Sequence, residues 1–235
     1  MRYDRQILLP QIGEEGQTKL EKATVTVIGC GGLGSPVLTY LACAGVGTLR
    51  IVDCDIVSET NLNRQFLHGE HSIGVDKTKS AVEALGAMNG DIRIEAHQMM
   101  VDEENFGALI AGSDAVVDCS DNAETRLVIN RGCLRADIPL IEGGINGFSG
   151  FVLCVDREHA CLGCLGYERS KKHGPLAVLG ATAGIIGSLQ AMECLKLLLG
   201  CGENLFGTML QYNGLTGAFD RIAVKTYAGC ICHSF

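Results

Sequence analysis

The sequence predicts an α/β fold in which a mainly parallel sheet is flanked by helices and continued by antiparallel strands on its C-terminal side. Two observations predict it. Short apolar, β-branched runs alternate with helical segments through about the first 140 residues, which is the pattern of βαβ units. The pattern then changes, because the later strand-like runs follow one another with a single long amphipathic helix between them.

The elements are expected in this order along the chain. A polar helix at 10–22 precedes a buried parallel strand at 23–28. Further parallel strands are expected at 48–53, 92–97, 114–119 and 139–143, and helices at 35–44, 77–88, 103–111 and 122–136. Antiparallel strands are expected at 150–155, 209–212 and 218–224, with a crossover loop at 165–180 and a helix at 181–199. Right-handed crossovers make the parallel part Rossmann-like.

Composition narrows the class of protein. The chain has 235 residues, and no linker or repeat divides it, so we expect one domain over 1–235 with halves at about 1–145 and 146–235. Lysine and arginine number 19 against 27 acidic residues, a net charge of −8, so the chain has no overall attraction for nucleic acid or an anionic membrane. An apolar share of 47% excludes a disordered chain.

The 12 cysteines indicate a reducing compartment, and we expect the cytoplasm. The N-terminal segment lacks the long apolar stretch of a signal peptide. No apolar run reaches about 18 residues without charges or glycine clusters, so we expect no transmembrane helix. Several cysteines lie singly in apolar runs and are expected to be small buried hydrophobic residues: Cys43, Cys54, Cys119, Cys154 and Cys194.

A glycine-rich turn follows the first strand and opens a helix. Its G-x-G-x-x-G glycines are Gly29, Gly31 and Gly34, with Gly32 between them. Such glycines let backbone N–H groups approach a phosphate at a helix N-terminus. Asp53, about 20 residues further on, ends the next strand, where a carboxylate can bind a ribose hydroxyl. The pattern fits a dinucleotide or ATP, and the alternative is a tight turn without a nucleotide.

Two segments after the second strand supply candidate phosphate ligands. Asn61 and Arg64 are three residues apart, which places them on one face of a short helix, and Lys77 opens a later helix. A forked arginine with a point-charge lysine suits a triphosphate better than nicotinamide chemistry. Asp55 and Gln65 lie in the same segments and are included as nucleotide-binding candidates. The alternative is an exposed helix with solvated charges.

Asp121 and Asn122 follow the fourth strand at the carboxyl edge of the predicted sheet. Ligands of open α/β sheets bind at this edge, and a carboxylate there can hold Mg²⁺ between phosphates. The alternative is that Asp121 or Asn122 caps the helix that follows.

A cysteine pattern in the second half predicts zinc. Cys161 and Cys164 form a C-x-x-C pair, and Cys230 with Cys232 or His233 would complete a tetrahedral site. A redox dithiol at Cys161 and Cys164 is the alternative.

Together these motifs resemble the MoeB/ThiF/HesA group of ubiquitin-activating-enzyme-like adenylyltransferases. The resemblance covers nearly the whole chain. Its segments are RYDRQIL, GCGGLGSP, DCDIVSETNLNRQFLH, DKTKS, DCSDNAETR, CLGC, GIIGSLQAMECLKLL and YNGLTGAF.

The resemblance implies an enzyme that uses Mg·ATP to adenylate the C-terminal Gly-Gly carboxylate of a small ubiquitin-fold sulfur-carrier protein, with release of pyrophosphate. It implies that Asp53 holds the ribose, Asn61 and Arg64 the phosphates, Lys77 the α-phosphate region and Asp121 the Mg²⁺ ion. Arg5 matches an arginine that relatives lend to the partner subunit, which implies a homodimer. The second half of the chain would then bind zinc and the carrier.

One departure concerns the later sulfur chemistry. ThiF-like members carry a cysteine in the crossover loop, where this chain has His173 and no cysteine between 165 and 193. The resemblance therefore implies adenylation, with a separate sulfur donor, but no covalent enzyme–carrier step.

Other functions remain as alternatives. A relative could adenylate another carboxylate or act on a tRNA base, and a non-catalytic scaffold could simply bind a ubiquitin-fold protein. A nicotinamide oxidoreductase would not need Arg64, Lys77 and Asp121. The sequence does not distinguish a thiamine pathway from a molybdopterin pathway.

Overall fold

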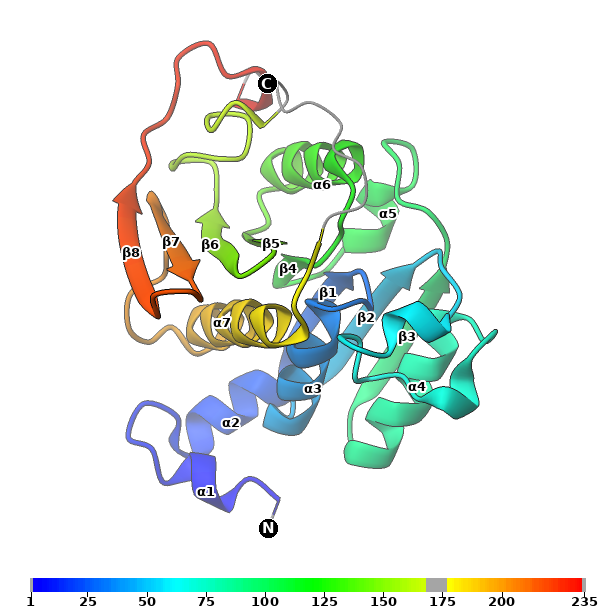
Figure 1. Cartoon of the computed structure of the whole chain (residues 1–235). Coiled ribbons are helices and arrows are strands. Elements are labelled where there is room, and N and C mark those ends of the chain that lie inside the picture. The colour runs from blue at the N-terminus through cyan, green and yellow to red at the C-terminus, as the bar shows by residue number, and fades with distance from the viewer. Residues whose placement is uncertain (1, 168–176, 234–235) are drawn as a thin grey trace.

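The computed structural model describes residues 2–167 and 177–233. Within those residues the strands form an eight-stranded sheet in the order β3-β2-β1-β4-β5-β6-β7-β8 (Figure 1). The strands are β1 (Thr24–Ile28), β2 (Thr48–Asp53), β3 (Arg93–Gln98), β4 (Ala115–Asp118), β5 (Leu140–Asn146), β6 (Ser149–Val155), β7 (Thr208–Asn213) and β8 (Ala218–Ala223). Strands β3 to β5 in this order pair in parallel, and β5 to β8 pair antiparallel, which confirms the predicted fold class.

Helices cover both faces of the sheet (Figure 1). They are α1 (Asp4–Ile7), α2 (Gly13–Lys22), α3 (Gly34–Ala44), α4 (Lys77–Met88), α5 (Phe106–Ile110), α6 (Ala123–Ala136) and α7 (Gly180–Leu199). Short 3₁₀ turns are η1 (Glu59–Asn61), η2 (Glu70–Ser72) and η4 (Ile231–His233). The observed bounds lie within a few residues of the predicted ones, as expected for elements with strong periodicity.

Three elements differ from the sequence prediction. The helix expected at 10–22 begins at Gly13 and is preceded by the unpredicted α1. The helix expected at 103–111 is shortened to α5, because Asp102 Oδ1 accepts hydrogen bonds from the amides of Glu104 and Asn105 in a local turn. Strand β5 extends to Asn146 because it joins β6 through a tight hairpin at Gly147, where φ is +58°.

The alternation of apolar residues along β1 builds two cores. Val25 and Val27 face the core that α3 and α7 cover, and Leu41 and Ile186 belong to the same cluster. Ile28 belongs to the second cluster, which α5 and α6 cover. Both faces of the parallel part are therefore buried, as βαβ crossovers require.

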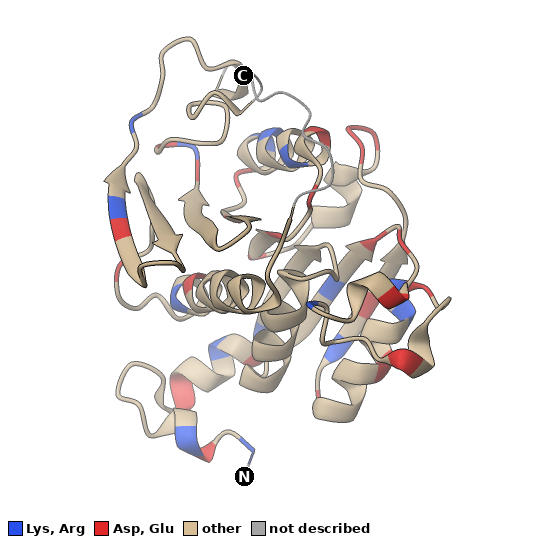
Figure 2. Ribbon diagram, viewed as in Figure 1, with Lys and Arg blue, Asp and Glu red and all other residues tan. Residues whose placement is uncertain are grey.

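Helix α7 is a core helix. By length and composition alone it could cross a membrane, but half of its apolar window is buried within the fold. It packs against α3, β5 and β6, and Figure 2 shows it almost free of charged residues apart from its C-terminal part. Burial against the sheet explains its apolar composition.

The expected burial of isolated cysteines is partly wrong. Cys119, Cys154 and Cys194 are buried, but Cys43 and Cys54 are exposed. Cys43 lies on the outer face of α3, and Cys54 lies just beyond the end of β2. A cysteine next to an apolar run is not always on the inward face, because burial depends on which way the helix or loop turns.

Close approach of α7 to α3 predicts opposite effects of two alanine substitutions in α7. A methyl group on Gly187 would lie 2.6 Å from the carbonyl oxygen of Leu33, whereas one on Gly184 would meet no atom of the described residues within 4 Å. Gly187→Ala should therefore lower the free energy of unfolding by about 1–3 kcal/mol through overpacking. Gly184→Ala should raise it by about 0.5–1 kcal/mol through helix propensity. Urea unfolding measures both, and equal effects would contradict the packing described.

Candidate functional site

Three loops meet at the carboxyl ends of the central strands. Strand β1 lies between β2 and β4, so the turn after Ile28, the segment after Val52 and the loop after Asp118 lie side by side. The chain moves to opposite sides of β1 from this point, which makes it the topological switch point of the sheet. The predicted nucleotide-binding residues follow these strand ends.

The glycine turn needs its glycines for steric reasons. Gly29 has φ of +99°, and a methyl group there would lie 2.7 Å from the carbonyl oxygen of Cys119. A methyl group on Gly34 would overlap the carbonyl oxygen of Gly29. Among the described residues, no side chain caps the N-terminus of α3. Its first amides are therefore suited to an anion, which is the property that the motif predicted.

Asp53 anchors this turn to the end of β2. Its Oδ2 accepts a hydrogen bond of 2.7 Å from the amide of Cys30, and its Oδ1 accepts one of 2.9 Å from the amide of Asp55. A carboxylate held by two backbone amides is fixed in direction. The structure therefore places Asp53 beside the glycine turn, as the sequence predicted.

Lys77 and Asp55 form an ion pair at the edge of the same site. Lys77 Nζ lies 2.8 Å from Asp55 Oδ2; the lysine side chain is 7% exposed and that of Asp55 62%. The amide of Lys77 also donates to the carbonyl oxygen of Asp55. The lysine is thus held by a partner that faces solvent, so that an incoming anion can share or replace that partner.

Asn61 ends the 3₁₀ turn η1, and Arg64 and Gln65 follow it without helical structure, so this segment is not the short helix that the sequence predicted. Asn61 Oδ1 accepts from the amide of Ser58, so this oxygen caps η1. Arg64 Nη1 donates to the carbonyl oxygen of Thr60 at 2.8 Å and to Asn63 Oδ1 at 3.0 Å. Asn61 and Arg64 therefore do not both point freely from one helix face, because the side-chain oxygen of Asn61 is used as a cap and only its amide nitrogen remains available.

Gln65 points to the glycine turn from the buried side. It is 5% exposed, and a methyl group on Gly31 would lie 3.5 Å from its Nε2. Its Oε1 is buried with no hydrogen-bond partner among the described residues. An unpartnered buried oxygen is costly, so this atom is suited to accept a hydrogen bond from a ligand.

The structure decides which of Asp121 and Asn122 caps the following helix. Asn122 caps α6, because its side-chain oxygen accepts a hydrogen bond of 2.9 Å from the amide of Glu124. Asp121 lies exposed on the loop just before it. The capping alternative therefore applies to Asn122 and leaves the carboxylate of Asp121 facing solvent at the sheet edge.

A buried charged network lies under this loop, and sequence reasoning missed it. Arg126 donates through Nη1 to Glu142 Oε2 at 3.3 Å and to the carbonyl oxygen of Gly143 at 2.7 Å, and through Nη2 to the carbonyl oxygen of Ser120. The amide of Ser120 in turn donates to Asp118 Oδ1 at 2.8 Å. The loop that carries Asp121 is thus fixed from below. Arg126 is the last residue of the DCSDNAETR segment, but no pattern in the sequence showed that its partner Glu142 would lie on β5.

The two carboxyl groups of this network lie opposite each other. Asp118 pairs with Glu142 in the register of β4 and β5. Burial, and then the nearby Asp118, raise the pKa of Glu142 well above its usual range. The raised pKa favours the neutral form of Glu142 beside the Arg126 guanidinium.

His68 ties the glycine turn to α4 and was also not predicted. Its ring lies 3.0 Å from the carbonyl oxygen of Cys30 through Nε2 and 2.9 Å from Ser80 Oγ through Nδ1. A carbonyl oxygen only accepts, so Nε2 carries the proton and Nδ1 accepts from the serine hydroxyl. Burial lowers the pKa of His68, which favours this neutral form.

The predicted metal ligands come together near the C-terminus. One ligand atom each from Cys161, Cys164, Cys230 and His233 lies within 4.8 Å of all the others. The sulfur atoms of Cys161 and Cys230 are 3.7 Å apart, and those of Cys161 and Cys164 are 3.9 Å apart. A tetrahedral zinc with bonds of about 2.3 Å requires about 3.8 Å between sulfurs.

Two features bear on the fourth metal ligand. Nε2 of His233 is buried without a partner among the described residues, which suits a metal ligand. Cys232 is buried beside the group, because a methyl group on Gly163 would lie 2.7 Å from its sulfur. His173, which stands where ThiF-like members have cysteine, lies outside the described residues.

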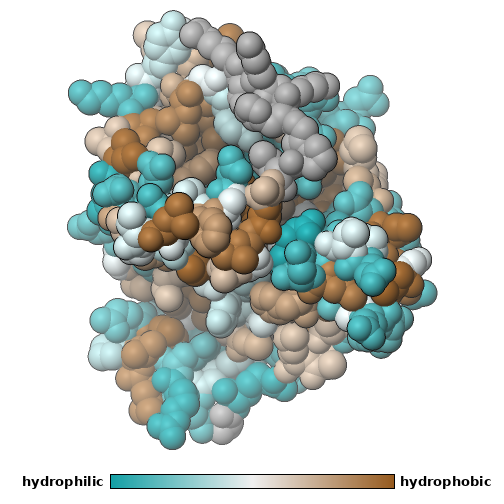
Figure 3. Space-filling model, in the orientation of Figure 1, coloured by the Kyte–Doolittle hydropathy of each residue, from teal (hydrophilic) through white to brown (hydrophobic). Residues whose placement is uncertain are grey.

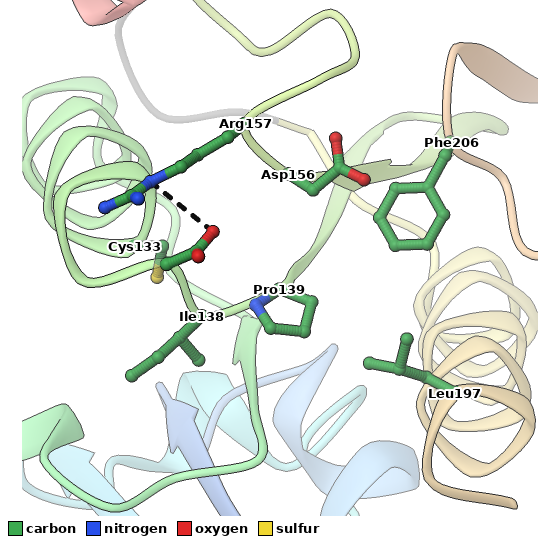
Figure 4. A pocket seen from close by; sticks show the side chains of 8 residues that line it. Cys133, Ile138, Pro139, Asp156, Arg157, Leu197 and Phe206 are labelled. Atoms are coloured by element: carbon green, nitrogen blue, oxygen red, sulfur yellow. Dashed lines mark ion pairs between the residues drawn. The ribbon is translucent and has the colours of Figure 1, made fainter. Parts of the chain in front are cut away.

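A small pocket lies beside the start of β5 and the end of β6, where Pro139 and Asp156 line it (Figure 4). Its volume is about 150 Å³, and Arg157 and Asp137 form an ion pair of 3.4 Å across it. Arg157 also donates to the carbonyl oxygens of Leu134 and Arg135 at the end of α6. The pocket is smaller than typical ligand sites and is explained by this helix-end contact.

Comparison with known proteins gives consistent matches. A model of the ThiF family matches residues 3–232. The SAMP-activating enzyme E1 of Haloferax volcanii is 38% identical, over 97% of this chain and 87% of its own length. The adenylyltransferase and sulfurtransferase MOCS3 of Mus musculus is 40% identical over 96% of this chain, which spans 50% of that relative.

Solved structures of E. coli MccB share the fold. The structure with ATP has a TM-score of 0.86 at 24% identity and covers 99% of this chain and 73% of that one. The structure with MccA-N7isoASN has a TM-score of 0.88 at 21% identity and covers 99% and 75%. At these identities the likeness concerns the arrangement of helices and strands alone.

The raised pKa of Glu142 predicts the pH dependence of a Glu142→Gln variant. A group whose pKa rises on folding contributes stability that is complete below the unfolded pKa and is lost as the pH rises toward the folded pKa. Glutamine keeps the shape without the titration. We expect unfolding free energies of variant and wild type within about 1 kcal/mol of each other near pH 5, with the variant gaining relative to wild type toward pH 8.

Glu95→Gln is the control of opposite sign. A hydrogen bond from Arg50 lowers the pKa of Glu95, so this carboxylate contributes stability above its unfolded pKa. That variant should lose stability relative to wild type as the pH rises from about 3 to 5, and the difference should then stay constant up to about pH 8. Urea unfolding from about pH 3 to 8 tests both variants, and a difference between Glu142→Gln and wild type that also stays constant from about pH 5 to 8 would mean that Glu142 is ionised in the folded protein.

Proposed function

Because the chain belongs to the ThiF family, we propose that it is an ATP-dependent adenylyltransferase that activates a small ubiquitin-like sulfur-carrier protein. In the proposed reaction the C-terminal Gly-Gly carboxylate of the carrier is adenylated and pyrophosphate leaves. The observation that carries the proposal is the meeting of the glycine turn, Arg64 and the Lys77–Asp55 pair at one end of the sheet. Similarity to a SAMP-activating E1 over most of both chains supports the carrier as the substrate.

In the proposed reaction the enzyme has to neutralise negative charge and to position the carboxylate against the α-phosphorus. A carboxylate oxygen of the carrier forms a bond to the α-phosphorus, and the bond from that phosphorus to the bridging oxygen breaks, so pyrophosphate leaves with the electron pair. Both reactants are anionic, which makes neutralisation of charge the main task. No side chain of the enzyme needs to act as a nucleophile.

Each predicted nucleotide ligand takes a role in this proposal. Asp53 would hold the ribose, the glycine turn and Arg64 the phosphates, and Lys77 the α-phosphate after exchanging Asp55 for it. Asn61 would offer its amide nitrogen, and Gln65 its unpartnered oxygen. Asn122 would act on the site only through the end of α6 that it caps.

Asp121 is proposed to hold Mg²⁺. Its exposed carboxylate at the carboxyl edge of the sheet is a hard oxygen donor of the kind that Mg²⁺ prefers. When bound, Mg²⁺ would neutralise charge on the leaving pyrophosphate. Arg126 would keep the loop in place through its hydrogen bond to the carbonyl oxygen of Ser120.

A homodimer with Arg5 acting in the partner's site is part of the proposal. Arg5 is exposed on α1, and large apolar side chains are exposed just after α1 and on α3 and α7: Leu8, Leu9, Tyr40 and Met192. Figure 3 shows apolar atoms along α7 and near the N-terminal segment. An apolar surface of this kind is typical of a subunit interface.

The two halves of the chain would divide the work. Residues 1–145 would bind the nucleotide, and residues 146–235 would bind zinc and the carrier. Strand β8 supports this division, because it is the exposed edge of the sheet along its whole length. Cytoplasmic location is proposed from the 12 free cysteines.

Zinc is proposed as a structural ion held by Cys161, Cys164, Cys230 and His233. The spacing of the sulfur atoms and the orphaned imidazole nitrogen support this set. Four protein ligands close the coordination sphere, so the ion would join the C-terminal segment to the 161–164 turn without taking part in the reaction.

The cations are tested by carrier-dependent ATP–pyrophosphate exchange. Arg64→Ala and Lys77→Ala should each lower kcat/KM by the equivalent of about 2–4 kcal/mol, because each removes a charge-assisted contact that strengthens as charge moves to pyrophosphate. Arg93→Ala is the matched control, since its exposed side chain pairs with Glu95 at the start of β3, away from the site. Exchange at the wild-type rate in both site variants would overturn the proposed function.

The metal set is tested by zinc content and thermal melting. Cys161→Ser and His233→Ala should each lower the bound zinc and the Tm, because loss of one ligand opens a closed site. Cys43→Ser controls for cysteine loss, because Cys43 is exposed and distant in the fold. Cys232→Ser should keep stoichiometric zinc. Loss of zinc in Cys232→Ser but not in His233→Ala would instead make Cys232 the fourth ligand.

A further inference from the structure

The first turn of α7 touches the turn that carries Arg64. A methyl group on Gly180 would lie 2.5 Å from the carbonyl oxygen of Asn63, 3.3 Å from Arg64 Cα and 3.4 Å from Arg64 Cβ. Two of these three atoms belong to the backbone, which cannot swing aside as a side chain can. Any residue other than glycine at 180 must therefore displace either α7 or the 63–64 turn.

Arg64 is also in contact on its other side. Its Cγ and Cδ would lie 3.6 and 3.8 Å from a methyl group on Gly32, in the glycine turn, and Ala183 of α7 would lie 3.3 Å from the same methyl group. The aliphatic part of Arg64 thus lies between the glycine turn and α7. Its distance from the glycine turn is set by how closely α7 approaches.

The turn around Arg64 is hydrogen-bonded as a unit. The amides of Arg64 and Gln65 both donate to the carbonyl oxygen of Asn61, at 3.1 and 2.9 Å. The guanidinium is bonded to the same turn, at the carbonyl oxygen of Thr60. Pressure on the carbonyl of Asn63 therefore moves the turn together with the side chain.

Helix α7 is the less movable partner of this contact. Gly187 packs it against Leu33 of the glycine turn, and the preceding segment is bonded to the β5–β6 hairpin, where the amide of Gly147 donates to Ala177 at 2.6 Å. The middle of the helix is buried in the core. A side chain at 180 would consequently displace the 63–64 turn.

We propose that Gly180 is a positioning residue for ATP, which sets the distance between Arg64 and the phosphate-binding glycine turn. This inference rests on the proposed function, since it assigns Gly180 to the same nucleotide site. It adds α7, an element of the second half of the chain, to the phosphate-binding machinery. Glycine is required there by the approach of the Asn63 carbonyl, because Gly180 does not have a positive φ.

Equilibrium dialysis with radiolabelled ATP and Mg²⁺ tests the proposal on the full chain. Gly180→Ala should raise the Kd for ATP about tenfold, because displacement of a phosphate ligand by about 1 Å is costly. Gly184→Ala, in the next turn of the same helix and with open space around it, should leave the Kd unchanged. Equal Kd values for Gly180→Ala and Gly184→Ala would overturn the inference.

A double-mutant cycle separates positioning from general destabilisation. In an Arg64→Ala background, Gly180→Ala should have little further effect on the Kd, because the displaced contact is already absent. A full additional tenfold effect would show that Gly180 does not act through Arg64. If Arg64→Ala binds ATP as the wild type does, Arg64 is not an ATP ligand and the Gly180 inference fails, whereas the proposed function is judged separately by pyrophosphate exchange.

Hydrogen exchange gives a readout without nucleotide. The peptide spanning 59–66 should exchange faster in Gly180→Ala than in wild type, while peptides of α3 and β5 exchange at unchanged rates. Gly184→Ala should leave the 59–66 peptide unchanged. Faster exchange across all peptides of Gly180→Ala, or no change in 59–66, would overturn the positioning role even if the variant binds ATP weakly.

Discussion

Buried hydrogen bonds from Arg126 to Glu142 and to the carbonyl oxygen of Gly143 join the parallel and antiparallel halves of the sheet. Strand β5 is where the direction of pairing changes, since it is parallel to β4 and antiparallel to β6. Arg126 spans from α6 to β5 and to the loop after β4. Gln190 of α7 completes the junction by donating to the carbonyl oxygen of Asp118 at 2.7 Å. Because these groups are desolvated, each must keep its partner, which fixes α6, α7 and both strands relative to one another.

The same constraint places the exposed candidate site on a rigid base. The loop with Asp121 is held by Arg126, the glycine turn by Asp53 and His68, and the turn with Arg64 by Gly180 and Gly32. Loops that are fixed from the buried side can present charged groups to a ligand without losing further entropy on binding. The chain has a net charge of −8, yet Arg64 and Lys77 lie at the carboxyl ends of the central strands, where the proposed reaction would bring its anionic reactants together.

Glycine contacts connect the two halves as much as the polar network does. Close approach at Gly187 sets α7 against α3, and close approach at Gly180 sets it against the Arg64 turn. Helix α7 belongs to the second half of the chain, and it therefore contributes to the wall of the proposed nucleotide site. This arrangement gives the proposed carrier-binding half a direct contact with Arg64, a proposed phosphate ligand.

The fold class, nearly all elements and the three loops of the candidate site could be predicted from the sequence. Period-2 and period-3.6 patterns act locally, and glycines with acids after strands indicate the carboxyl edge wherever parallel strands align. Which side chains are hydrogen-bond partners became known only from the three-dimensional structure. Asn122 rather than Asp121 caps α6, Glu142 faces Asp118, and His68 reaches Cys30. It also placed His233 in the group of metal-ligand atoms and exposed Cys43 and Cys54. These outcomes depend on strand register and on the direction of loops, which bring together residues far apart in the chain. No local sequence pattern indicates such long-range pairs.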